Sequence, residues 1–337
     1  MTFYTNDEEL IRLGATYLRI IGFAFLFDSF GQVYACIMVN IGHVLKSTIY
    51  SVTSALLNVA LNAFLIFGLL GAPKLGIVGA AVASVISVAI KTIFYIIELI
   101  KDGFASGLIK RLFFSKSKYL SMFAKQSAPV VMQGFLWALA DNVLTSYVGH
   151  MGPDVVAGKA LIGLVLGMFT AVSMGFREAV NVLIGNDLGR GNLKLAKRKG
   201  SWVFRTSIAV GLVNGVLMYM VGRLVMLLPM GFTEDALKYS SIILIIYSLN
   251  LLFHSPNNMI NGCLFAGGET KYVFMVDAIC SWGVLVGIGA ILIYVIKAPI
   301  IICLFFILLG EWYSFPFKFG RLRSGKWVKN LTKQTMD

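Results

Sequence analysis

A small number of polar and ionisable side chains lie far inside long apolar segments, and these are the first candidates for chemistry. Asp28 lies near the middle of one such segment, and Gln32 follows one helical turn later on the same face. In a second segment His254 precedes Asn257 and Asn258 at helical spacing. A charged carboxylate in hydrocarbon costs at least about 2.5 kcal/mol, so each group needs a partner, a water-filled cavity or a proton.

Asp28 and His254 together suggest proton exchange. A carboxylate and an imidazole in two facing helix bundles can take up and release protons, because burial disfavours the charged form of both groups. The alternative is that each group only forms hydrogen bonds within its own bundle. Both interpretations remain open from the sequence.

Asp141 is the third candidate, with Asn142 beside it and with Gln133 and Trp137 at preceding positions of the same segment. Its carboxylate could bind Na⁺ or the ammonium group of a substrate, and the indole of Trp137 could offer an aromatic face to an organic cation. The alternatives are that Asp141 pairs with Lys159 and that Trp137 packs against lipid.

Membrane-spanning helices must position these side chains. Of the 337 residues, 58% are hydrophobic and only 13% are charged, whereas a soluble domain has about 25% charged residues. A helix needs about 20 apolar residues to cross the hydrocarbon layer. We therefore predict an all-α polytopic membrane protein with nine spans, at about residues 10–44, 47–70, 75–100, 119–149, 155–183, 201–228, 236–266, 272–296 and 299–317.

The net charge of +13 indicates membrane topology and not a nucleic-acid partner. When the spans are threaded alternately, almost all flanking lysines and arginines, Lys318 among them, fall on one side, and only Lys74 and Lys297 fall on the other. The positive-inside rule then predicts a plasma-membrane protein with a cytoplasmic C-terminus. The sequence has no paired acids, His/Cys cluster or phosphate loop at a cytoplasmic rim, which disfavours an enzyme and indicates no cofactor.

The sequence contains a weak internal repeat. Phe-Asp-Ser at 27–29 matches Phe-His-Ser at 253–255, a shift of 226, and Gly42 falls on Gly268 at the same shift. Parallel repeats of this kind are typical of transporters built from two facing bundles, so we expect about a hundred residues and three further helices ahead of Met1. We divide the chain into a partial N-terminal bundle with its cytoplasmic linker (1–118), a complete six-helix bundle (119–319) and a basic cytoplasmic tail (320–337).

Four short motifs, in order along the chain, resemble the multidrug and toxic compound extrusion (MATE) family. The first contains Asn58 and Asn62 and continues into the small-residue run 75–84, whose glycines and alanines would let helix backbones approach closely. The second is Gly-Asn-Asp-Leu-Gly-Arg-Gly-Asn at 185–192. The third and fourth are Gly-Gly-Glu-Thr-Lys at 267–271 and Arg-Ser-Gly-Lys-Trp at 323–327.

The resemblance implies a two-bundle, inverted-V transporter, represented here from the family's fourth helix to its twelfth. It also implies a central cavity and the exchange of Na⁺ or H⁺ for amphipathic, often cationic, compounds. By this alignment Asn62 takes the place of a functional acid in helix five of other members. Trp137 takes the place of an acid of the NorM-like branch, and Asp141 lies one turn later.

We therefore expect secondary active efflux of drugs or toxic metabolites by alternating access, incomplete in this chain. The expected partners are a small organic substrate, Na⁺ or H⁺, and the lipid bilayer, with a possible Na⁺ at Asp141 and no other metal assigned. Two alternatives remain. One is a flippase for a lipid-linked sugar precursor of the same superfamily, which would need a strongly basic cavity, and the other is a non-functional transporter fragment.

Overall fold

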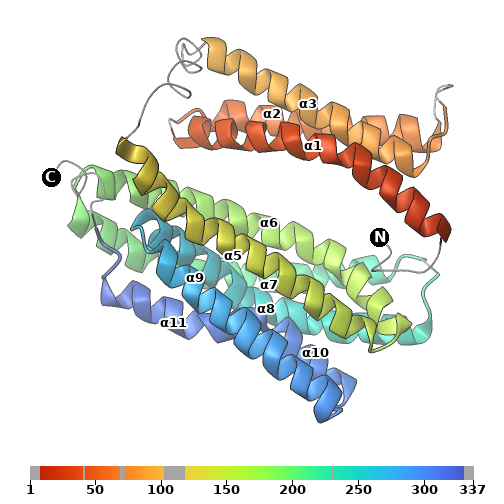
Figure 1. Ribbon diagram of the computed structural model, residues 1–337. Helices are drawn as coiled ribbons and strands as arrows, with labels where there is room; N and C mark the ends of the chain where they lie inside the picture. The colour runs from red at the N-terminus through yellow and green to blue at the C-terminus, as the bar shows by residue number, and fades with distance from the viewer. Residues whose placement is uncertain are drawn as a thin grey trace. The chain divides into compact units, whose positions relative to one another are not determined.

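The computed structural model describes residues 8–40, 42–68, 71, 73–101, 118–229 and 231–329, and these ranges are almost entirely helical (Figure 1). The chain divides into two compact units, Met1–Ser117 and Lys118–Asp337. The predicted linker at 102–117 and the end of the predicted tail, 330–337, lie outside the described ranges. The all-α fold expected from the sequence is confirmed.

The first unit contains the described helices α1 (Glu8–Asn40), α2 (Val44–Phe67) and α3 (Ile77–Lys101). α3 packs against both α1 and α2. A Cβ added to Gly79 would collide with the carbonyl group of Leu65, and one added to Gly31 would press against Thr92. The expected role of the 75–84 run in close helix approach is therefore confirmed at Gly79.

The second unit begins with α5 (Lys118–Gly149), α6 (Pro153–Gly189), α7 (Leu193–Met226) and α8 (Glu234–Ala266). α9 (Thr270–Ala278) continues through the π-helical segments η2 (Ile279–Ile288) and η3 (Ile291–Val295), and α10 (Ile300–Leu308) and α11 (Gly310–Ser324) follow. α8 packs against α6, α7 and α11, and its residues 255–264 are all buried. α8 is therefore the central helix of this unit.

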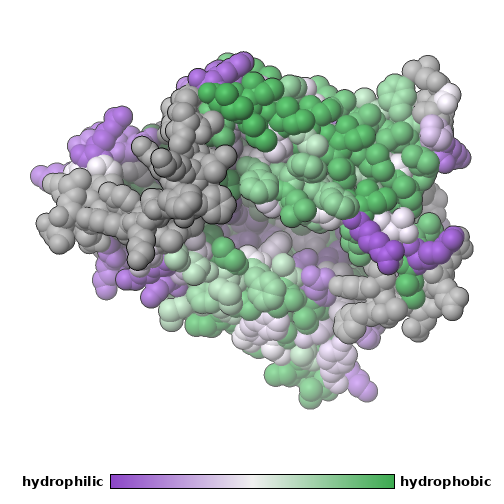
Figure 2. All heavy atoms as spheres, turned by 45° about the horizontal axis from the view of Figure 1, so that its top comes forward, coloured by the Kyte–Doolittle hydropathy of each residue, from purple (hydrophilic) through white to green (hydrophobic). Residues whose placement is uncertain are grey.

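Among the described residues, eight helices are long and apolar enough to cross a membrane, in agreement with eight of the nine predicted spans. The remaining one, α5, has 32 residues but carries polar side chains such as Gln133 and Asp141. Apolar side chains cover much of the visible coloured surface (Figure 2), and Phe30, Leu45 and Leu164 are 73–76% exposed. Such a surface is suited to lipid, whereas the polar positions of α5 need protein or water beside them.

One helix start follows the same repeat as the sequence. α9 begins at Thr270, 226 residues after the start of α2 at Val44. The predicted shift therefore also relates the starts of two helices.

The segment after α11 closes over one end of the second unit. Trp327 is 1% exposed, and its backbone packs so closely on Gly267 that a Cβ there would collide with it. Glu269, between α8 and α9, binds Arg321 through one carboxylate oxygen and Lys329 through the other. Residues 320–329, which the sequence assigned to a basic tail, thus pack as part of this unit. We call the contacts of these five residues the C-terminal clamp.

The C-terminal clamp should depend on pH. Burial alone would raise the pKa of Glu269, but hydrogen bonds from Lys329 and Arg321 outweigh it and hold the pKa below its ordinary value of 4.5. A carboxylate whose pKa is lowered by folding stabilises the fold above its ordinary pKa, and this contribution is lost as the pH falls through the lowered value. We expect Glu269→Gln to melt at a lower temperature than wild type at neutral pH, with the difference shrinking below pH 4.5.

Thermal unfolding of both proteins in detergent at the two pH values measures this effect. A difference in melting temperature that stays the same at both values would mean that the carboxylate charge of Glu269 does not hold the clamp.

Candidate functional site

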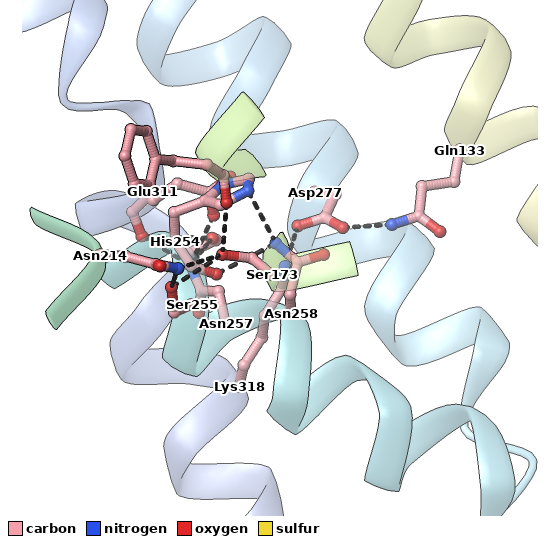
Figure 3. Close-up of polar contacts among 12 residues, drawn as sticks. Gln133, Ser173, Asn214, His254, Ser255, Asn257, Asn258, Asp277, Glu311 and Lys318 are labelled. Carbon is pink, nitrogen blue, oxygen red and sulfur yellow. Dashed lines mark hydrogen bonds and ion pairs between the residues drawn. The ribbon is translucent and has the colours of Figure 1, made fainter. Parts of the chain in front are cut away.

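Polar side chains gather inside the second unit where three helices carry an internal proline. These prolines are Pro129 in α5, Pro256 in α8 and Pro316 in α11. Proline has no N–H, so each one leaves a backbone carbonyl without its helical partner and bends the helix. The residues close to them, which we call the central polar cluster, come from α5, α8, α9 and α11 (Figure 3): Gln133, His254, Asn257, Asn258, Asp277, Glu311, Ser314 and Lys318.

His254 and Glu311 are the acid–base pair at the core of this cluster. His254 Nδ1 lies 3.0 Å from Glu311 Oε1, and the Asn257 amide donates to Glu311 Oε2 at 2.7 Å and to Ser314 Oγ at 3.1 Å. His254 Nε2 lies 3.1 Å from the amide nitrogen of Asn258, which also donates to the His254 carbonyl at 3.0 Å. The His254 and Glu311 side chains are only 13% and 26% exposed, so neighbouring protein groups satisfy most of their polar atoms.

Both ring nitrogens of His254 face polar partners. The amide nitrogen of Asn258 lies 3.1 Å from Nε2, and the Glu311 carboxylate lies 3.0 Å from Nδ1. An amide nitrogen can only donate, so a proton on Nε2 would require the Asn258 amide to turn.

His254 and Asp28 each have an ionisable partner within their own unit. The carboxylate bound to the His254 imidazole is Glu311 of α11. Asp28 pairs with Lys91 Nζ of α3 at 2.6 Å. Proton exchange by Asp28 and His254 together stays a prediction. Gln32 is exposed on α1.

Asp277 forms a second acid–base pair, with Lys318. The Lys318 Nζ lies 2.7 Å from Asp277 Oδ1, and Gln133 donates to the other carboxylate oxygen. The sequence placed Lys318 among the cytoplasmic flanking charges, whereas the structure buries it at 2% exposure because Asp277 neutralises its charge. The helix changes to π-type winding just after Asp277, a distortion that is frequent at functional sites.

Three short polar side chains fasten α6, α7 and α8 beside the cluster. The hydroxyl oxygens of Ser173 and Ser255 lie 2.8 Å apart, and Asn214 donates to them at 3.3 and 3.2 Å. All three residues are buried. Hydrogen bonds between helices stabilise helix association in a membrane, because lipid supplies no hydrophobic drive for it. These bonds fix α8 directly next to His254.

Three other predicted residues lie on the outside of α5. Asp141 and Asn142 are exposed, and Trp137 is 61% exposed. The Asn142 amide donates to a carbonyl of its own helix at 2.8 Å. Lys159, the alternative partner of Asp141, donates to Thr145 at 3.0 Å, although the charge of Asp141 still acts on it.

Asn62 belongs to a polar groove of the first unit. Its amide donates to Asn58 at 3.0 Å, and Asn58 donates to Ser84 and Ser87. A pocket of about 340 Å³ lies alongside and is lined by the hydroxyl, amide and ammonium groups of Ser51, Ser54, Asn58, Ser84, Ser87 and Lys91, together with two apolar residues. No carboxylate is among these lining residues, and the Lys91 ammonium group is paired with Asp28.

The sequence reasoning missed Asp277, Glu311 and Lys318. Asp277 and Glu311 lie inside long apolar segments, so the energetic argument that singled out Asp28 applies equally to them. Lys318 lies directly after the predicted end of the last segment. Glu311 and Lys318 are seven residues apart, which places them on one face of a helix two turns apart. Pro129, Pro256 and Pro316, which lie inside apolar segments, also indicated that the helices are irregular near these residues.

The described residues contain no group of three His, Cys, Asp or Glu side chains that could hold a metal ion. Two buried amide oxygens at the cluster, Asn257 Oδ1 and Asn261 Oδ1, have no hydrogen-bond partner. Buried acceptors of this kind call for a donor, a water or a hard cation. The cluster therefore offers two oxygen ligands beside its acid–base pairs.

Comparison with known proteins connects this fold to transporters. The MatE family profile matches residues 1–64 and 129–291. The chain is 26% identical over 325 residues to the probable multidrug resistance protein YoeA of Bacillus subtilis, covering 94% of this chain and 67% of YoeA. It is 25% identical over 242 residues to the probable multidrug resistance protein NorM of Haemophilus ducreyi, covering 70% of this chain and 52% of that protein.

A solved structure has the same fold. The bent form of the Vibrio cholerae MATE transporter VcmN matches with a TM-score of 0.73 at 17% identity, over 96% of this chain and 73% of VcmN. Identity this low establishes only the fold, while the family profile establishes membership because it covers more than half of the chain and both units. The motifs, the fold and the profile agree, and the protein belongs to the MatE family of multidrug transporters.

Proposed function

We propose that this chain carries out secondary active efflux of small amphipathic or cationic compounds in exchange for protons, by alternating access. It would lie in the plasma membrane with its C-terminus in the cytoplasm, which the excess of lysine and arginine on that side favours. The observation that carries the proposal is the His254–Glu311 pair, an imidazole and a carboxylate held 3.0 Å apart inside a helix bundle.

Proton binding at this pair changes the contacts between α8 and α11. Glu311 on α11 accepts hydrogen bonds from His254 and Asn257 on α8. A proton on the carboxylate removes part of its capacity to accept, and a proton on the imidazole turns the Asn258 amide. A ligand shifts a conformational equilibrium by binding one state better than the other, so a proton that prefers the rearranged contacts drives the bundle toward them.

The geometry favours protons over Na⁺ as the coupling ion. Both oxygens of Glu311 already accept hydrogen bonds from nitrogen donors, and Na⁺ at this carboxylate would have to displace one of them. A proton adds to a single nitrogen or oxygen of the pair, and a neighbouring amide such as that of Asn258 only has to turn. The free oxygens of Asn257 and Asn261 are the ligands that a Na⁺-coupled version would use.

Asp141 and Trp137 are the residues that we propose for a cationic substrate. They are four residues apart on α5, so they lie on one face of the helix, and both are exposed. A carboxylate and an indole face together attract an organic ammonium group. Gln133, one further turn back on the same face, connects this surface to Asp277 in the central polar cluster.

The test is transport by the purified full-length chain in proteoliposomes, with the fluorescent cation ethidium as substrate. We expect ethidium movement under an imposed pH gradient and none under a Na⁺ gradient alone. Asp141→Asn should weaken ethidium transport more than transport of a neutral amphipathic dye, because only the cation loses an opposite charge. Ethidium transport driven by a Na⁺ gradient alone would show that Na⁺, and not the proton, is the coupling ion. The absence of ethidium transport under either gradient would refute the proposal.

A further inference from the structure

A groove on the outside of the second unit lies between α5 and α9 and includes no member of the central polar cluster. It has a volume of about 440 Å³, and its lining includes Lys125, Pro129, Met132, Lys271, Phe274 and Met275. Apart from the two lysines this lining is apolar. We call it the α5–α9 groove. It combines two positive charges with a hydrocarbon surface, which is unusual for simple packing between helices.

The two lysines mark one end of the groove. Lys271 is the second residue of α9, and Lys125 lies two turns into α5. Four spans separate the two helix starts, so both helices begin on the same side of the membrane. Thr270 donates to Gln126 at 2.9 Å and ties the residues next to the two lysines together. Lysines near helix ends extend their ammonium groups to the membrane–water interface.

Neither lysine is neutralised by an acid in the described part of the chain. Elsewhere lysines such as Lys318 and Lys329 lie in ion pairs, but no described residue forms one with Lys125 or Lys271. Glu269, the acid nearest to Lys271 in the sequence, is already bound by Arg321 and Lys329. Two exposed ammonium groups therefore remain available at the mouth of the groove.

The apolar part continues from the lysines toward the membrane interior. Met132 lies two turns beyond Lys125, about 10 Å along the helix, and Met275 lies one turn beyond Lys271. The two methionines are 46% and 58% exposed. Their flexible thioether side chains adapt to irregular apolar ligands. This surface can accommodate a hydrocarbon chain that runs parallel to the helices.

We propose that the α5–α9 groove binds an anionic phospholipid, with its phosphate between Lys125 and Lys271 and one acyl chain along Met132 and Met275. A basic pocket between helices at the interface selects headgroups with a net negative charge. A zwitterionic phospholipid brings its own ammonium group against the two lysines, so phosphatidylglycerol binds better than phosphatidylcholine. The bound lipid holds α9 against α5, next to the contact between Asp277 and Gln133.

Native mass spectrometry of the full-length chain in neutral detergent tests this proposal. We add dioleoyl phosphatidylglycerol or dioleoyl phosphatidylcholine and measure the fraction of protein that retains lipid. Wild type should retain phosphatidylglycerol preferentially. Lys125→Gln/Lys271→Gln should bind phosphatidylglycerol about 25-fold more weakly, because each lysine at an anionic headgroup is worth about fivefold. Its affinity for phosphatidylcholine should be unchanged.

The matched control is Lys194→Gln/Arg198→Gln, which removes two exposed charges from α7 at the same side of the membrane. Equal retention of the two lipids by wild type, or an equal loss in the two double variants, would overturn the proposal. Met275→Trp, which fills the groove and keeps both lysines, should also weaken phosphatidylglycerol binding. Glycerol 3-phosphate should not compete, and effective competition would indicate a phosphate site instead of a lipid site.

Discussion

Lys318→Met alone is expected to destabilise the protein by about 3–5 kcal/mol, the usual loss when one partner of a buried ion pair is removed. Lys318 is 2% exposed, and its ammonium group neutralises Asp277 at 2.7 Å. Without it the carboxylate keeps only the hydrogen bond from Gln133 inside an apolar bundle. Unfolding by SDS titration, followed by circular dichroism in detergent, measures the change in the free energy of unfolding.

The double variant Asp277→Asn/Lys318→Met is the decisive comparison. It removes both charges, so it should be more stable than Lys318→Met even though it contains one more substitution. Arg177→Met is a matched control, because Arg177 pairs with Glu178, whose side chain is 55% exposed, and exposed pairs contribute about 1 kcal/mol or less. A double variant as unstable as the sum of its single variants would show that the pair is not coupled.

Glu311→Gln is expected to lower pH-driven ethidium transport by about 5–150-fold. This factor corresponds to the typical coupling free energy between two sites, about 1–3 kcal/mol. Glutamine has the shape of glutamate and can still accept the hydrogen bond from His254 Nδ1, but it cannot gain or lose a proton. The pH gradient should therefore no longer act on α8 and α11. Proteoliposomes with an imposed pH gradient give the transport rate directly.

Ethidium exchange at equal pH on both sides separates lost coupling from lost folding. Glu311→Gln should retain most of this exchange, because exchange of bound ethidium does not require net proton movement. Glu178→Gln, on the exposed side of its bundle, should behave like wild type in both assays. Transport by Glu311→Gln that still follows the pH gradient would exclude Glu311 as the coupling group.

The helical architecture could be predicted from the sequence to a large extent. The repeat found between residues 27–29 and 253–255 recurs in the starts of α2 and α9. Length and apolar character determine a span without any knowledge of its neighbours, because each helix satisfies its own backbone hydrogen bonds in lipid. α5 was predicted as a span despite its polar residues, and the tertiary structure explains one of them, because Gln133 binds Asp277 of α9.

The short motifs were enough to indicate the family, but they did not explain why particular residues are required at their positions. Gly267 and Glu269 belong to one motif and Trp327 belongs to another, and the two motifs meet in the C-terminal clamp. The backbone of Trp327 requires glycine at 267, and Glu269 binds Lys329 just beyond it. Contacts between residues sixty positions apart leave no periodic signal, so the sequence could identify these residues but not connect them.

The sequence by itself determined the membrane-spanning helices, their repeat and the family, because these depend on apolar length and short motifs along the chain. Only the tertiary structure decided which intramembrane charges pair. It joined His254 to Glu311, Asp28 to Lys91 and Lys318 to Asp277. The physical reason is that a charge inside an apolar segment needs a partner, and the sequence of that segment alone shows this need. Which residue becomes the partner depends on which faces of distant helices pack together.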